Sequence, residues 1–163
     1  MLKVFKPNLM IDSYLDFDAE KFAKMGYKVL LTDLDNTLVP FDVKVINQEV
    51  EDFISKNKSY GIETIIFSNN NANRVDSFAG DCSVPHYARA LKPLKLRYKD
   101  VIKMHGYKSS EVVCMGDQLL TDIAGANRMH MYSIYVKPIV NRDGWSTKLN
   151  RKIERWIFKR MGR

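Results

Sequence analysis

Residues 28–37 read KVLLTDLDNT, and this stretch decides the fold of the 163-residue chain. The apolar run over 28–32 predicts a β-strand, because it is short and rich in residues that favour strands. Polar and turn-forming residues follow it at once. In open α/β sheets, ligands bind outside the carboxyl ends of the strands. The stretch therefore predicts a strand that ends at a binding site.

The rest of the chain repeats this change from strand to helix. Further strands are predicted at 63–67, 84–87, 111–115 and 131–136, and helices at 17–25, 46–58, 73–79, 95–105 and 119–128. This alternation predicts an α/β fold of three layers, a Rossmann-like parallel sheet with helices on both faces. Polar clusters follow three more of the strands: SNN at 68–70, KP at 92–93 and GDQLLTD at 116–122. We expect all of them to meet at one edge of the sheet.

These clusters combine carboxylates with a lysine, a set that suits phosphate chemistry. A phosphate monoester is anionic and repels a bare carboxylate, so a hard cation such as Mg²⁺ is expected between them. Asp33, Asp35 and Asp117 supply the carboxylates. Ser68 and Lys92 can bind the phosphoryl oxygens, the lysine through its compact positive charge. Taken singly, each residue could equally form a turn, cap a helix or face the solvent.

The clusters DLDNT, Ser68, Lys92-Pro93 and GDQLLTD resemble, in their usual order, the four motifs of the haloacid dehalogenase (HAD) superfamily. The resemblance covers about residues 28–136. The longer runs DLDNTLVP and GDQLLTDIAGANRM are similar to the YqeG-type branch of class III HAD phosphatases, the class without a cap domain. Relatives of that branch include phosphatidylglycerophosphate phosphatases of bacteria and mitochondria. The chain differs from the branch at His130, where Gly is common.

The resemblance implies a Mg²⁺-dependent phosphomonoester hydrolase that works through an aspartyl-phosphate intermediate. Asp33 would be the nucleophile, and Asp35 would be the general acid and then the general base. Mg²⁺ would be held by the Asp33 carboxylate, the Asp35 backbone carbonyl and Asp117. Asp122 would orient Lys92 or a metal-bound water. The phosphate-binding residues that the resemblance implies are Ser68, Asn69, Lys92 and Thr37. An acid at position 35 favours phosphatase chemistry, because dehalogenases and ATP-driven pumps of the superfamily lack it.

The spacing of the motifs leaves no room for a cap domain, the inserted unit through which many HAD enzymes choose substrates. Thirty residues separate Thr37 from Ser68, and 23 separate Ser68 from Lys92, enough in each case for a helix and a short connection. We therefore expect an open site and a phosphate on a large molecule: a lipid headgroup, a protein or a nucleic-acid end. A small soluble phosphate is also an alternative substrate, because some capless enzymes close their sites by oligomerising. The oligomeric state is left open.

The net charge of +7 is concentrated at the C-terminus. Residues 137–163 carry nine Lys or Arg and two acidic residues, so residues 1–136 are neutral overall. We expect a phosphatase domain at 1–136 and a basic amphipathic extension at 137–163, packed on or next to it. A predicted helix over 147–161 carries an apolar stripe: Leu149, Ile153, Trp156, Ile157 and Met161. Such a helix suits an anionic membrane surface, or it packs its stripe on the domain. Nucleic acid is disfavoured, because residues 1–136 offer no basic stripe.

The remaining features exclude some classes of protein. The longest apolar runs are too short to span a bilayer, and the N-terminus lacks the apolar core of a signal peptide. Cys82 and Cys114 match no metal or disulfide spacing, which suits a reducing cytoplasm. The complete motif set disfavours a non-catalytic scaffold. We expect a cytoplasmic phosphatase, peripheral on the inner face of the membrane, that acts in phospholipid synthesis on phosphatidylglycerophosphate.

Overall fold

A computed structural model of the protein describes residues 2–80, 84–140 and 145–162, without the side chains of 145–149 and of Arg151. Two side chains named above, Cys82 and Leu149, therefore lie outside the described residues, and so do five side chains of the C-terminal extension: Arg142, Trp145, Lys148, Arg151 and Arg163. Everything that follows concerns the described part of the chain.

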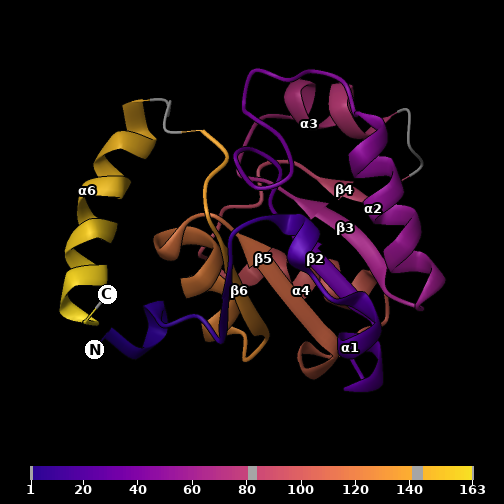
Figure 1. Ribbon diagram of the computed structural model, residues 1–163, viewed down its shortest axis with the longest axis horizontal. Coiled ribbons are helices and arrows are strands. Elements are labelled where there is room, and N and C mark those ends of the chain that lie inside the picture. The colour runs from indigo at the N-terminus through magenta and orange to yellow at the C-terminus, as the bar shows by residue number, and fades with distance from the viewer. Residues whose placement is uncertain (1, 81–83, 141–144, 163) are drawn as a thin grey trace.

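The described residues contain a six-stranded sheet in the order β1-β6-β5-β2-β3-β4, in which all neighbouring strands are parallel (Figure 1). The strands are β1 (Leu9–Ile11), β2 (Val29–Thr32), β3 (Glu63–Phe67), β4 (His86–Tyr87), β5 (Val112–Gly116) and β6 (Tyr132–Val136). The five strands predicted from sequence are all present, β4 being two residues shorter. β1 was not predicted. It is a three-residue edge strand that pairs with β6, with Leu9 opposite Ile134.

Helices connect the strands, as the sequence predicts. They are α1 (Ala19–Lys24), α2 (Gln48–Ser59), α3 (Ala72–Ala79), α4 (Lys95–Met104), α5 (Ala124–Arg128) and α6 (Trp145–Arg160). Asn47 and Asn71 cap α2 and α3, because each side chain accepts a hydrogen bond from an amide of the first turn. The predicted helix at 119–128 begins instead with a π-helical turn, η5 (Leu119–Ile123), before α5. No helix in the described ranges is both long and apolar enough to cross a membrane.

The sheet is covered on both faces, which confirms the three-layer prediction. Successive side chains of a strand point to opposite faces. In β2, Leu30 packs with Phe53 of α2 on one face, whereas Leu31 packs with Tyr98 of α4 on the other. Within the described residues, the connections between strands hold these helices and short loops but no cap domain. In the described residues, no inserted domain therefore covers the carboxyl ends of the central strands.

The C-terminal helix α6 packs beside the sheet through part of the apolar stripe predicted for it. Ile157 is buried, whereas Ile153 and Trp156 are 42% and 52% exposed. The buried carboxylate of Glu154 accepts a hydrogen bond from the amide of Leu119 at 2.6 Å, at the start of η5. Of the predicted stripe, Ile157 and Met161 therefore pack inward, whereas Ile153 and Trp156 face the solvent. Figure 1 shows α6 running along one side of the molecule to end near the N-terminus.

His130 occupies a backbone conformation that glycine adopts more easily. It follows α5 with a φ of 57°, in the left-handed region. A non-glycine residue there costs about 1–2 kcal/mol, which fits the Gly that the resemblance leads us to expect at this position. The turn is nevertheless formed, and β6 begins two residues later.

Candidate active site

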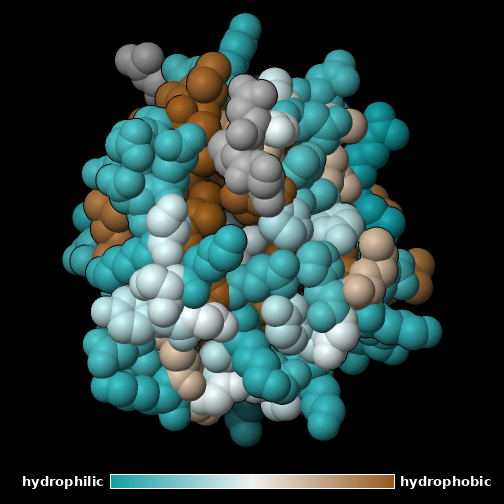
Figure 2. Space-filling view, turned by 90° about the vertical axis from the view of Figure 1, so that its right-hand side faces the viewer, coloured by the Kyte–Doolittle hydropathy of each residue, from teal (hydrophilic) through white to brown (hydrophobic). Residues whose placement is uncertain are grey.

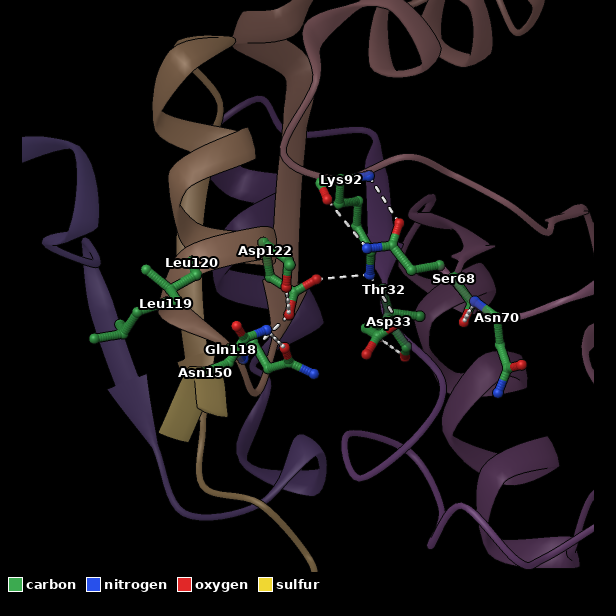
Figure 3. Close-up of polar contacts among 12 residues, drawn as sticks. Thr32, Asp33, Ser68, Asn70, Lys92, Gln118, Leu119, Leu120, Asp122 and Asn150 are labelled. Carbon is green, nitrogen blue, oxygen red and sulfur yellow. Dashed lines mark hydrogen bonds and ion pairs between the residues drawn. The ribbon is translucent and has the colours of Figure 1, made fainter. Parts of the chain in front are cut away.

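The residues predicted to form the site come from four segments that meet at the carboxyl edge of the sheet. Asp33 directly follows β2, and Asp117 directly follows β5, its neighbour in the sheet. Lys92 lies in the loop between β4 and α4, and Asp122 lies in η5. All four side chains are buried, with residue exposures of 0 to 7%. Figure 3 shows Lys92 reaching down between Asp122 and Asp33.

Lys92 joins two of these carboxylates. Its Nζ donates to Asp33 Oδ1 at 2.7 Å and to Asp122 Oδ1 at 2.6 Å. Burial alone would lower the pKa of Lys92, but the charges and hydrogen bonds of Asp122 and Asp33 outweigh it and raise the pKa above its ordinary value. Lys92 therefore stays protonated. Burial raises the pKa of Asp122 to about 6, against the opposing effect of the Lys92 charge.

Three of the carboxylates are close enough to hold one metal ion. Asp33, Asp117 and Asp122 each offer an oxygen, and these oxygens lie within 4.8 Å of one another. Three carboxylates and one ammonium leave two negative charges among these four buried groups. Because buried charges are costly unless they are compensated, a divalent cation would balance the cluster. Clustered oxygen donors suit a hard cation such as Mg²⁺. The residues present therefore fit a divalent metal.

Asp35 is bound instead by Asn70, from the predicted SNN cluster, and by Arg74, which sequence reasoning missed. Its Oδ1 accepts hydrogen bonds from Arg74 Nε at 3.0 Å and Nη2 at 2.8 Å, and its Oδ2 accepts one from Asn70 Nδ2 at 2.9 Å. The Asp35 and Arg74 side chains are 18% and 11% exposed, so this ion pair is partly buried. Arg74 lies in the first turn of α3. The one feature of the sequence that points to this position is Asn71, which caps the start of the helix.

The other predicted phosphate-binding residues lie around Lys92. Asn69 binds the backbone of Lys92 at both ends of its side chain: Oδ1 accepts from Lys92 N at 2.7 Å, and Nδ2 donates to Lys92 O at 3.1 Å. These two hydrogen bonds position Lys92, and they use both ends of the Asn69 side-chain amide. Ser68 is buried, and its Oγ accepts from Asn70 N at 3.1 Å. The Thr37 hydroxyl is buried and has no hydrogen-bond partner among the described residues. Phosphate contacts of Ser68 and Thr37 stay predictions.

Gly116, the last residue of β5, leaves the space that Asp122 occupies. A Cβ at Gly116 would lie 2.2 Å from Asp122 Cγ, far inside contact distance. We expect Gly116→Ala to displace Asp122 and with it the support of Lys92, at a cost of about 1–3 kcal/mol in the free energy of unfolding. Urea unfolding measures this cost. Gly80→Ala is the matched control, because a Cβ at Gly80 meets nothing within 4 Å. Equal stability of the two variants would contradict the placement of Asp122.

The chain is similar in sequence to known proteins. A family profile described as HAD-hydrolase-like matches residues 90–157. The chain is 34% identical over 161 residues to Probable phosphatase YqeG of Bacillus subtilis, an alignment that covers 99% of this chain and 94% of that protein. It is 26% identical over 157 residues to Phosphatidylglycerophosphate phosphatase 1, chloroplastic, of Chlamydomonas reinhardtii, covering 90% of this chain but 58% of that longer protein.

Solved structures share the fold at low sequence identity. The cobalt-bound form of the deoxy-D-mannose-octulosonate 8-phosphate phosphatase from Haemophilus influenzae superposes with a TM-score of 0.55 at 13% identity, covering 71% of this chain and 70% of that one. An uncharacterized protein from Listeria monocytogenes serotype 4b gives a TM-score of 0.56 at 18% identity, covering 72% and 84%. These likenesses concern the fold alone.

The fold and the sequence similarity together define the class of the protein as a HAD-type phosphatase. Within that class, the chain belongs to the capless YqeG family. A phosphatase acts on a phosphorylated substrate, and HAD phosphatases generally use a divalent metal, with which the buried carboxylates of Asp33, Asp117 and Asp122 are compatible.

Proposed function

We propose that the protein is a Mg²⁺-dependent phosphomonoesterase that acts through an aspartyl-phosphate at Asp33, on the headgroup phosphate of a phospholipid such as phosphatidylglycerophosphate. The observation that carries the chemistry is the position of Lys92, buried between Asp33 and Asp122 beside Asp117. A protonated lysine held there supports a phosphoryl group in contact with a carboxylate nucleophile.

In the first half-reaction, a carboxylate oxygen of Asp33 attacks phosphorus, and the bond between phosphorus and the leaving alkoxide breaks. Lys92 faces the phosphoryl oxygens, on which negative charge is spread in the transition state, and Ser68 donates to them. Mg²⁺, held by the Asp33 carboxylate, the Asp35 backbone carbonyl and Asp117, would neutralise the repulsion between nucleophile and phosphate. Asp122 keeps Lys92 in place through its 2.6 Å hydrogen bond.

Asp35 donates a proton in the first half-reaction and accepts one in the second. Its protonated carboxyl gives a proton to the leaving alkoxide, which departs as an alcohol. The resulting carboxylate then takes a proton from the water that attacks the aspartyl-phosphate, so that phosphate leaves and Asp33 is restored. Asp35 Oδ2 is the oxygen suited to this task, because it accepts a single hydrogen bond from Asn70 while Oδ1 accepts two from Arg74.

Three observations support a lipid headgroup as the carrier of the phosphate. The described residues hold no cap domain, so the site stays open to a phosphate attached to a large surface. A relative aligned over 90% of this chain is named a phosphatidylglycerophosphate phosphatase. The outward face of α6 offers basic residues beside exposed Ile153 and Trp156, which suits an anionic membrane surface through 137–163. The inner face of α6 packs on the domain.

A substrate screen tests the function. Phosphate release is measured with a generic aryl phosphate, phosphatidylglycerophosphate in mixed micelles, a 3′-phosphorylated oligonucleotide and a phosphopeptide, each with Mg²⁺ or with EDTA. We expect Mg²⁺-dependent release from the aryl phosphate and much faster release from the lipid. Turnover of the oligonucleotide or phosphopeptide but not of the lipid would move the proposal to that substrate. Unchanged activity in EDTA would overturn the metal requirement.

The ion pair between Arg74 and Asp35 leads to a separate prediction. Arg74→Gln removes the two hydrogen bonds that orient Asp35, so we expect kcat to fall by about 10- to 100-fold, with KM little changed. The loss is larger for an alkyl than for an aryl phosphate, because a poorer leaving group depends more on its proton donor. Arg160→Gln, at an exposed position of α6, is the control. An equal loss for both substrates would contradict the positioning role.

A further inference from the structure

Exposed apolar side chains gather on the loops that follow β2, β4 and β6. We call them the apolar rim: Phe41, Val45, Leu91, Leu94 and Ile139, which are 45%, 64%, 55%, 58% and 44% exposed. Exposed apolar residues scattered singly over a surface need no explanation, but a group around a binding site does. Figure 2 shows the side of the molecule that lies to the right in Figure 1, where brown apolar areas are interspersed with teal hydrophilic ones.

The three loops lie on the same edge of the sheet as the nucleophile, on both sides of it. In the sheet order, β4 and β6 are each two strands away from β2, on opposite sides. Neighbouring strands are about 4.8 Å apart, so the loops after β4 and β6 begin about 10 Å to either side of Asp33. The loop that carries Phe41 and Val45 continues from β2 itself. The apolar rim is therefore distributed around the entrance of the site.

Two parts of the apolar rim are joined to site residues through the backbone. Leu91 directly precedes Lys92, and the amide of Leu94 donates to Leu91 O at 2.8 Å. The amide of Ile139 donates to Asn36 O at 3.1 Å, within the motif that holds Asp33. These short connections leave the rim side chains at the mouth of the site.

Leu91 is held in an unfavourable conformation while it faces the solvent. Its φ is 53°, in the left-handed region, and Arg89 beside it has a φ of 48°. Such a conformation costs about 1–2 kcal/mol for a non-glycine residue and is found where a surrounding structure or a function requires it. A leucine that is 55% exposed recovers little of this cost from the core.

Basic side chains stand between the apolar ones. Lys44, Arg89 and Lys95 are exposed. Lys44 and Lys95 lie next to Val45 and Leu94 in sequence, and Arg89 lies two residues before Leu91. Asp42 is the acidic residue among them, and Lys137 approaches Asp12 at 4.0 Å at the edge of the surface. Apolar side chains mixed with an excess of Lys and Arg are typical of surfaces that bind anionic lipid bilayers, where each basic residue adds to the attraction.

We propose that the apolar rim inserts into the interfacial layer of an anionic phospholipid bilayer and brings a headgroup phosphate straight into the site. The strands then point towards the membrane, and the phosphate meets Lys92 and Asp33 without leaving the lipid surface. This proposal builds on the lipid substrate proposed above. It differs from docking through α6, which runs along the side of the molecule and, lying flat on a bilayer, would turn the site opening along the membrane.

Flotation with vesicles tests the apolar rim without any substrate. The full chain is mixed with vesicles of phosphatidylcholine containing phosphatidylglycerol, and its partition between lipid and water is measured. We expect Phe41→Ser with Leu94→Ser to weaken binding about tenfold or more, because apolar surface no longer leaves water. Met25→Ser with Met104→Ser is the matched control, since both residues are exposed and end the helices before β2 and β5, at the opposite edge.

The outcomes separate the rim from α6 and from the catalytic proposal. Hydrolysis of an aryl phosphate should be unchanged in the rim variant, which shows that it is folded and active. Loss of vesicle binding in Ile153→Ser with Trp156→Ser, but not in the rim variant, would overturn the proposal in favour of α6. Failure of the unaltered chain to bind the vesicles would also overturn it, while leaving the phosphatase chemistry untouched.

Discussion

Replacing Asp33 by Asn should reduce phosphate release from any substrate by at least about 10⁴-fold, the size of effect seen when a covalent nucleophile is removed. Asn has the shape of Asp but no anionic oxygen to attack phosphorus. The measurement is single-turnover phosphate release in Mg²⁺. A second measurement follows the intermediate: after acid quenching with labelled substrate, a labelled peptide containing Asp33 should be present in the unaltered protein and absent in the variant.

The control for this variant is Asp12→Asn, because the Asp12 side chain is 91% exposed and far from the site in sequence. It should keep full activity. The Asp33→Asn protein should remain folded, since one negative charge is removed from a cluster that has an excess of them, and Asp122 still pairs with Lys92. Activity that survives in a folded Asp33→Asn protein would rule out the aspartyl-phosphate mechanism.

The sheet could be predicted because its signals are local. A buried parallel strand reads as a short apolar run, and Val29–Thr32 is buried at every position. The polar residues that follow each strand then meet at one edge without further information, which is why Asp33, Lys92 and Asp117 could be named together. β1 was not predicted, because a strand of three residues, Leu9–Ile11, is too short to show a recognisable apolar pattern.

The partners of the site residues could not be predicted, because they depend on side-chain geometry between distant segments. Arg74 meets Asp35 across 39 positions, and no pattern in the sequence pairs these two residues. Asn69 was expected to face phosphate, yet both ends of its amide bind the backbone of Lys92. Glu154 is one of the two acidic residues of the basic extension at 137–163, and nothing in the sequence indicates that it is buried. Helical period predicts which residues share a face, not which face is turned inward.

Replacing Lys92 by Met should damage both stability and activity. The Lys92 side chain is 3% exposed and pairs with the carboxylates of Asp33 and Asp122, which are 8% and 1% exposed. Met fills a similar volume, but it leaves these buried carboxylates without their common cation. Breaking a buried ion pair from one side costs about 3–5 kcal/mol in the free energy of unfolding. We also expect kcat to fall by about 10²- to 10³-fold, because the phosphoryl oxygens lose a preorganised positive charge.

A double substitution separates the two effects of Lys92. Lys92→Met with Asp122→Asn removes one of the orphaned charges, so it should be more stable than Lys92→Met alone by about 0.5–3 kcal/mol, the range of coupling between contacting residues. Its activity should stay low, since the cation that faces the phosphate is still missing. Urea unfolding without metal and phosphate release with Mg²⁺ measure the two effects. Lys99→Met, at an exposed position of α4, should change stability by less than about 0.5 kcal/mol. If Lys92→Met proved as stable and active as Lys99→Met, the buried bridge would have neither of its proposed roles.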